Sequence, residues 1–295
     1  MDKTELYELL CDPVTKEPLK YMDDKLVSSA TKFPIVKGVP VLLKDKDFRI
    51  QQIEVLNKEK YKVGFSWALK HWNDLGIDEL LGKSESDTKR LLNFGSGSPK
   101  EKELMENLGY DVVSMDINAG YQGVDVIADG HHLPFKNQSF NTVTAFEVLE
   151  HLHEPWNAIK EINRVLSEGG RFVGSVAFLK EFHKSYFHMS YWGVTKLLEY
   201  GGFEVERIYG GQSVFNRLIG GLFPLGPKKI SETLYLTFDR IIMSLRSFIW
   251  STKHKTSAYK KLRRFDNRFE FSFREYNRLV YAPTVLFNAR KIKNV

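Results

Sequence analysis

Residues 90–97, Arg90-Leu-Leu-Asn-Phe-Gly95-Ser-Gly97, decide the fold of this chain. A short apolar strand runs directly into a glycine-rich turn, and a helical stretch follows from Lys100 to Leu108. Such a turn lets the backbone pass close to a ligand at a helix N-terminus, where N–H groups are free to donate. A strand, a turn and a helix in this order predict the first unit of a ligand-binding α/β sheet.

The alternation of strands and helices continues after this unit. A helix with Ile159, Ile162, Val165 and Leu166 on one face is predicted before Gly169, and a short helix over residues 194–200. Further strands are predicted at 111–115, 124–128, 140–146, 171–178 and 203–208. This pattern indicates parallel strands with right-handed crossovers, a doubly wound α/β sheet. A seventh strand, 285–291, is predicted to pair antiparallel with 203–208.

Length and composition limit the class of protein. The chain has 295 residues, of which 42% are hydrophobic and 27% charged, as in ordinary globular proteins. The single cysteine, Cys11, excludes a disulfide scaffold and an all-cysteine zinc site. The N-terminus has no signal-peptide pattern, and no apolar run reaches the roughly 18 residues of a spanning helix. We expect a cytoplasmic protein, at most peripheral at the inner face of a membrane.

The sequence divides into three parts. Residues 1–45 combine short apolar runs with turn signals such as Gly38-Val39-Pro40, which predicts a small β-rich domain. Residues 46–88 are predicted to form a helical linker that covers the cofactor. Residues 89–295 form the sheet domain, with a helical insertion at 211–280 between its last two strands.

The insertion is basic. It holds 14 Lys and Arg against 5 Asp and Glu, in a chain whose net charge is +6. An apolar stripe runs from Leu234 to Ile249 and follows an apolar loop at 218–226. Two interpretations stay open: peripheral membrane contact through 218–264, or packing of the stripe on the protein with the cations in water. No stacking platform or RNA-binding motif accompanies the cations, so no nucleic-acid partner is expected.

Acidic residues follow the second and third predicted strands. Asp116 lies about 20 residues after the glycine turn, where a carboxylate can accept both ribose hydroxyls of a nucleoside. Asp129 and Gly130 end the next strand, where an acid can reach an adenine amino group. A dinucleotide is disfavoured, because Lys100 and Glu101 stand where its fingerprint needs a third glycine. The strand ends together predict a nucleoside site in one crevice.

At this point the chain resembles the class I S-adenosylmethionine-dependent methyltransferases, in the subgroup that methylates small molecules. The matching stretches lie within about residues 89–210: LLNFGSGSP, VVSMDI, ADGHHLPFKNQSFNTVTAFEVLEHL, LSEGGRFVGSV and GGFEV. The resemblance implies S-adenosyl-L-methionine as cofactor and a small-molecule, glycan or lipid-linked acceptor, methylated at oxygen. The cofactor residues that it implies are Asn93, Phe94, Gly95, Ser96, Gly97, Asp116, Ile117, Ala128, Asp129, Gly130, Phe146, Glu147 and Val148.

Two positions depart from the family pattern. Asn93 replaces the acid that normally ends the first strand, and Pro99 replaces a third glycine. A non-catalytic binding protein with the same sheet is therefore one alternative function, and a nucleic-acid methyltransferase that uses the basic insertion is another.

Histidines are the candidate catalytic residues. Glu147, Glu150 and His151 are spaced to share one helical face, an arrangement that either binds a divalent metal or leaves His151 facing the acceptor. We adopt the second interpretation and expect no metal. His183 and His188 lie in the loop after the fifth strand, where an acceptor lid is expected; structural hydrogen bonds are the alternative.

The N-terminal residues show a second resemblance. DPVTKEPL at 12–19 and TKFPIVKGVPVLL at 31–43 are similar to the zinc-ribbon-like activator domain of tRNA methyltransferases. Asp12 and Thr15 occupy the places of the first cysteine pair, so four zinc ligands cannot be assembled. The resemblance implies the ribbon fold without its metal.

Overall fold

The computed structural model of this chain describes residues 1–57, 80–82, 90–179, 185–211 and 282–295, with residues 241, 245 and 279. No helix in these ranges is long and apolar enough to cross a membrane. Most of the basic insertion lies outside the described residues, including the loop at 218–226 and, apart from Ile241 and Leu245, the predicted stripe from Leu234 to Ile249.

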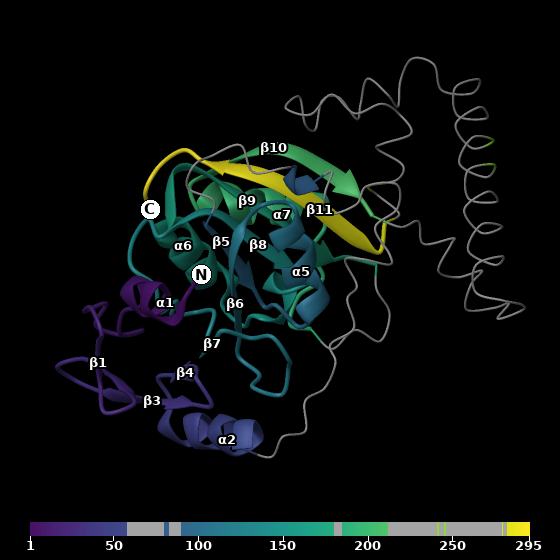
Figure 1. Ribbon diagram of the computed structural model, residues 1–295. Helices are drawn as coiled ribbons and strands as arrows, with labels where there is room; N and C mark the ends of the chain where they lie inside the picture. The colour runs from purple at the N-terminus through teal and green to yellow at the C-terminus, as the bar shows by residue number, and fades with distance from the viewer. Residues whose placement is uncertain are drawn as a thin grey trace, which may run out of the picture.

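The core of the protein is a sheet with seven strands in the order β7-β6-β5-β8-β9-β11-β10 (Figure 1). Their bounds are β5 Arg90–Phe94, β6 Asp111–Asp116, β7 Val126–Ala128, β8 Phe140–Phe146, β9 Leu166–Ala177, β10 Phe203–Gly210 and β11 Thr284–Lys291. The first five pair in parallel, and β11 pairs antiparallel with both β9 and β10. The predicted α/β fold class and the antiparallel last pair are confirmed.

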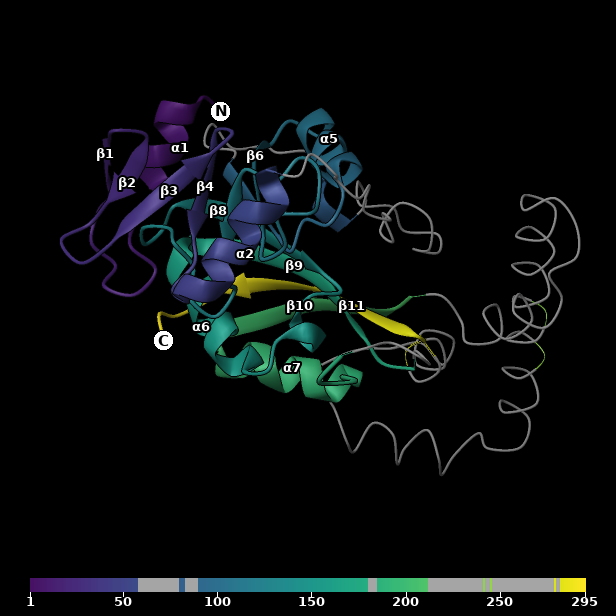
Figure 2. The ribbon, with the colours of Figure 1, turned by 90° about the horizontal axis from the view of Figure 1, so that it is seen from below.

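Helices cover both faces of this sheet (Figure 2). On one face, Met105 of α5 (Pro99–Asn107) packs in a cluster with Leu91 and Val112. On the other face, α6 (Pro155–Val165) and α7 (Tyr191–Tyr200) pack in a cluster with Leu92 and Val113. Neighbouring residues of a strand point to opposite faces, so the continuous apolar runs of β5 and β6 serve both layers.

One helix boundary differs from the sequence prediction. Leu166 was expected on the apolar face of the helix, but α6 ends at Val165 and Leu166 begins β9. Leu166 pairs with Phe140, and the register then shifts before Arg171 pairs with Thr142. Because Leu166 is fully buried in either conformation, its hydrophobicity could not distinguish helix from strand.

The N-terminal unit extends the sheet. After α1 (Lys3–Leu9), strands β1 (Lys20–Met22), β2 (Lys25–Val27), β3 (Lys32–Val36) and β4 (Val39–Leu42) pair antiparallel in sequence. β4 then pairs in parallel with β7, through Val41 with Ile127 and Leu42 with Ala128. The sequence did not predict this junction, although the buried run Val41-Leu42-Leu43 is typical of a strand covered on both faces. Helix α2 (Lys46–Asn57) follows.

The N-terminal unit also forms hydrogen bonds with the loop between β7 and β8, residues 129–139. Cys11 N–H donates to the Pro134 carbonyl at 2.9 Å, and Lys136 N–H donates to the Leu9 carbonyl at 2.9 Å. Lys16 Nζ lies 2.6 Å from Glu161 Oε2 of α6 and 3.2 Å from the Leu133 carbonyl. These contacts add the loop and α6 to the β4–β7 pairing as links between the N-terminal unit and the sheet domain.

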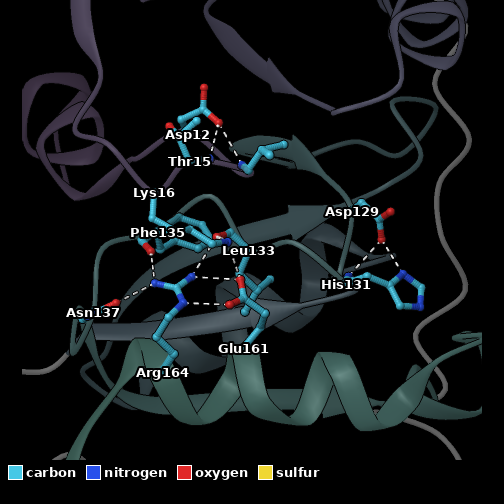
Figure 3. Close-up of polar contacts among 11 residues, drawn as sticks. Asp12, Thr15, Lys16, Asp129, His131, Leu133, Phe135, Asn137, Glu161 and Arg164 are labelled. Carbon is cyan, nitrogen blue, oxygen red and sulfur yellow. Dashed lines mark hydrogen bonds and ion pairs between the residues drawn. The ribbon is translucent and has the colours of Figure 1, made fainter. Parts of the chain in front are cut away.

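Arg164 of α6 donates hydrogen bonds to the same loop from the side opposite the N-terminal unit (Figure 3). Its guanidinium donates to the carbonyls of Leu133 at 2.9 Å and Phe135 at 2.7 Å, and to Asn137 Oδ1 at 2.9 Å. It also contacts both oxygens of Glu161, at 2.8 and 2.9 Å. Burial alone would raise the pKa of Glu161, but Arg164 and Lys16 hold it below its ordinary value. The loop is therefore fixed by charged groups of two separate elements.

Asp12 orders the turn after α1 through hydrogen bonds of its carboxylate. Its Oδ1 accepts from the N–H groups of Val14 at 2.8 Å and Thr15 at 3.0 Å, and Ser28 Oγ donates to its Oδ2 at 2.6 Å. Burial alone would raise the pKa of Asp12, but these bonds and nearby Lys16 hold it below its ordinary value. The ionised carboxylate therefore joins the turn to the β2–β3 connection.

Substitution Asp12→Ala should lower the free energy of unfolding by about 1–3 kcal/mol at neutral pH, because three donors lose a buried acceptor. A lowered pKa in the folded protein means that this stability exists above the unfolded value, about 3.9, and is lost as pH falls through the folded value. The difference from wild type, measured by urea unfolding at several pH values, should shrink below about pH 4. The exposed Asp111→Ala is the control, and an equal loss in both variants would contradict the assignment.

Candidate functional site

A cavity of about 640 Å³ opens at the carboxyl ends of β5, β6, β7 and β8. Parallel strands bring these ends to one edge of the sheet, which is where open α/β sheets bind ligands. The lining residues are Phe94, Gly95, Ser96, Gly97, Glu101, Met115, Asp116, Ile117, Asn118, Tyr121, Ala128, Asp129, Gly130, His131, Phe146, Glu147, Val148, His151, Leu152, His153 and Tyr186.

The glycine turn, Gly95 to Gly97, forms part of the cavity wall. Gly95 has φ +72°, and a Cβ there would collide with the Val148 side chain, so this position needs glycine for both reasons. Gly95 N–H donates to the Met115 carbonyl at 2.8 Å, and Gly97 N–H donates to Asp116 Oδ2 at 3.2 Å. The turn after β5 is therefore bonded directly to the end of β6.

Asp116, at the end of β6, is a buried acid that lines the cavity. Its side chain accepts from Asn118 N–H at 2.8 Å as well as from Gly97, and the residue is 8% exposed. Burial raises the pKa of Asp116, and the bonds from Asn118, Gly97 and Ile117 N–H groups oppose that rise. The carboxylate is thus held in place and still faces the cavity.

Asp129 is paired with a histidine that the sequence analysis did not select. Its Oδ1 lies 2.7 Å from His131 Nδ1 and accepts from His131 N–H at 2.9 Å (Figure 3). The other ring nitrogen, Nε2, accepts from Glu154 N–H at 3.3 Å. These partners assign the proton to Nδ1, so His131 is a neutral donor to Asp129. The His153 ring lies 4.2 Å from the His131 ring, and Tyr186 lies beyond it.

The predicted helical face with Glu147, Glu150 and His151 is wrong. Glu147 has φ +55°, so no helix begins there, and only a short 3-10 helix, η1 (Leu149–His151), follows. Glu147 Oε1 accepts from Thr284 Oγ1 of β11 at 3.1 Å, whereas fully buried Glu150 accepts from Ala177 N–H at 3.0 Å. Within the described residues, no group of His, Cys, Asp and Glu could hold a metal ion.

The structure brings twelve of the thirteen proposed cofactor residues to the cavity wall. The exception is Asn93, which is 1% exposed and lies within β5. Among the candidate catalytic residues, His151 lines the cavity. His188 is not among the lining residues, and its Nδ1 lies 2.9 Å from the Phe178 carbonyl; His183 lies outside the described residues.

Several lining residues were missed by sequence reasoning. Glu101, Tyr121, His131, His153 and Tyr186 all face the cavity. His131 follows Asp129 at a strand end and could have been found by that position. Tyr121 and Tyr186 come from loops whose path a sequence pattern does not give.

The charges of the cavity have one sign. Four carboxylates line it, those of Glu101, Asp116, Asp129 and Glu147, and no Lys or Arg does so among the described residues. A phosphate-bearing ligand would need cationic donors there. The lining therefore favours a cationic or neutral ligand over a nucleotide phosphate.

Comparisons with known proteins agree with this geometry. Residues 92–174 match the family model described as "Methyltransferase domain". Demethylmenaquinone methyltransferase of Renibacterium salmoninarum is 30% identical over 113 residues, 35% of this chain and 46% of that protein. A Mycolicibacterium smegmatis protein named "Probable S-adenosylmethionine-dependent methyltransferase" is 30% identical over 141 residues, 41% of this chain and 54% of that protein.

A solved structure described as a putative methyltransferase from Bacillus halodurans has a TM-score of 0.42 at 16% identity, covering 70% of this chain and 94% of that one. The chain spans about half the length of the curated relatives it matches. Residues 92–174 are thus similar to a methyltransferase domain, and they lie on a mostly parallel α/β sheet.

Proposed function

We propose that this protein is an enzyme that binds S-adenosyl-L-methionine in the carboxylate-lined cavity and transfers its methyl group to a small-molecule acceptor. The observation that carries the proposal is that four carboxylates line the cavity beside a glycine turn, while no Lys or Arg is present in the described lining. S-adenosylmethionine carries a sulfonium and an ammonium group against one carboxylate, so it is a net cation. Its charge suits this lining, whereas a dinucleotide's pyrophosphate does not.

Each part of the cofactor has residues that fit it. Asp116 would accept the ribose hydroxyls, and Asp129, oriented by His131, would accept from the adenine amino group. The backbone of Gly95 and Gly97 would pass along the methionine part, with Phe146, Glu147 and Val148 beside the sulfur. Carboxylate Oδ atoms that already accept N–H bonds still have lone pairs for ligand hydroxyls.

When bound, the cofactor would supply a methyl group on a positively charged sulfur; the acceptor oxygen would bond to that methyl carbon while its bond to sulfur breaks, and a neutral thioether would leave. The protein's own contribution is alignment of the acceptor, exclusion of water and removal of the acceptor's proton. His151 lines the cavity and is exposed, so it could take a proton from a hydroxyl. We assign that role to His151, with His183 and His188 as candidates in the loop that follows β9.

The acceptor class is also part of the proposal. We propose a hydroxyl on a small molecule, a glycan or a lipid-linked compound, encountered in the cytoplasm or at the inner face of the membrane. The nearby His153 and Tyr186 would supply ring faces at the mouth of the cavity. We further propose that residues 1–45 are a metal-free relative of the zinc-ribbon activator domain, followed by a cofactor cover at 46–88.

Replacing Asp116 tests the cofactor assignment. Asp116→Ala should weaken S-adenosylmethionine binding, measured by isothermal titration calorimetry, by roughly 30- to 150-fold, because two ribose hydroxyls lose a buried acceptor worth about 2–3 kcal/mol. Asp111→Asn, an exposed residue at the other end of β6, is the control. Thermal unfolding must show both variants folded. Unchanged affinity in Asp116→Ala, or no binding by the wild type, would count against the proposal.

The basic insertion calls for a separate test. If it contacts membranes, the protein should co-sediment with anionic liposomes at low salt and be released at moderate salt, because lipid attraction adds about 1 kcal/mol per nearby cation. Replacing Leu222 and Phe223 by Ser should abolish the co-sedimentation. Failure to sediment at low salt would favour the packing interpretation of the apolar stripe.

A further inference from the structure

Glu101 is an acid in an unusual place. It belongs to the first turn of α5, whose N-cap is Ser98, and it is 7% exposed while lining the cavity beside Gly95–Gly97. The other acids of the helix, Glu103 and Glu106, are exposed to solvent. Glu101 thus places a carboxyl group at the cavity wall beside the backbone of the glycine turn, near the N-terminus of α5, where negative charge is favourable.

The other three carboxylates of the cavity lie at or directly after the ends of β6, β7 and β8. Asp116 accepts from Gly97 and Asn118, Asp129 from His131, and Glu147 from Thr284. In the proposed pose, Asp116 and Asp129 hold the nucleoside, at the ends of β6 and β7. The amino-acid end of the ligand then lies along the glycine turn, on the side from which α5 begins.

The strand that precedes the turn, β5, has no acidic residue at its carboxyl end. Asn93 is neutral, and its Nδ2 has no hydrogen-bond partner among the described residues, although its Oδ1 accepts from Thr144 at 3.3 Å. An amide nitrogen donates and so cannot hold an ammonium group. Along the turn, the carboxylate on the cavity wall is that of Glu101.

We infer that Glu101 binds the ammonium group of the cofactor's amino-acid part, so that the charge absent from the end of β5 is provided from the first turn of α5. The inference rests on the proposed function. It makes Glu101 a specificity-determining residue, because a ligand without the amino-acid part gains nothing from this carboxylate. S-adenosylmethionine should therefore be distinguished from 5′-methylthioadenosine, which keeps the nucleoside and lacks the amino acid.

The test compares the two ligands by calorimetric titration of the full chain, with competition against S-adenosylmethionine where direct titration is too weak. Glu101→Gln should weaken S-adenosylmethionine binding at least about tenfold, as expected for loss of a charge-assisted bond, and leave 5′-methylthioadenosine binding within about twofold. The matched control, Glu103→Gln on the same helix, should change neither.

The outcomes separate the two proposals. A wild-type protein that binds neither ligand overturns the proposed function. A wild-type protein that binds S-adenosylmethionine, with Glu101→Gln binding it equally well, overturns only the role of Glu101. Equal weakening of both ligands by Glu101→Gln also overturns that role, since it would mean that the residue supports the shape of the turn.

Discussion

The parallel pairing of β5 with β6 on one side and β8 on the other is the constraint on which the site depends. Parallel strands end at the same edge, so the turn at Gly95, the acid at Asp116 and the segment at Glu147 meet there. Antiparallel pairing would send one of these ends to the far side of the sheet. The Gly97–Asp116 bond then fixes the spacing between two of the strand ends.

The loop between β7 and β8 connects the cavity wall with the N-terminal unit and α6. Its first residues, Asp129 to His131, form a wall of the cavity, and its later residues are held by Arg164 and by the N-terminal unit (Figure 3). Lys16 and Arg164 share Glu161, so the helix, the loop and the N-terminal unit meet at one carboxylate. Displacement of this cluster would move Asp129 to His131, the segment that we propose contacts the adenine.

The central sheet was predictable because its signals are local. The apolar runs of β5, β6 and β8 are each followed by a turn or an acid, and the order of these marks in the sequence is enough to place the crevice. The proposed cofactor residues come from a family resemblance whose motifs lie at these same strand ends, and most of them line the cavity. Asn93 differs because alternation along β5 puts its side chain inside the sheet domain.

The remaining features depend on tertiary contacts that no local pattern contains. The parallel junction of β4 with β7 joins segments more than 80 residues apart, and Thr284 reaches Glu147 from the far end of the insertion. The failed helical face at 147–151 has a similar origin. The Ser175 carbonyl of β9 accepts from Glu147 N–H at 2.9 Å. Glu147 has a left-handed backbone conformation there, so no helix begins at this residue.

The most direct test of the central claim is a crystal structure of the full chain with S-adenosylmethionine bound. We expect the ribose hydroxyls within hydrogen-bond distance of the Asp116 carboxylate, the adenine against Asp129 and Gly130, and the amino-acid part along Gly95–Gly97. Density for the ligand anywhere other than the carboxyl edge of β5 to β8, or in this cavity with its nucleoside and amino-acid ends exchanged, would contradict it.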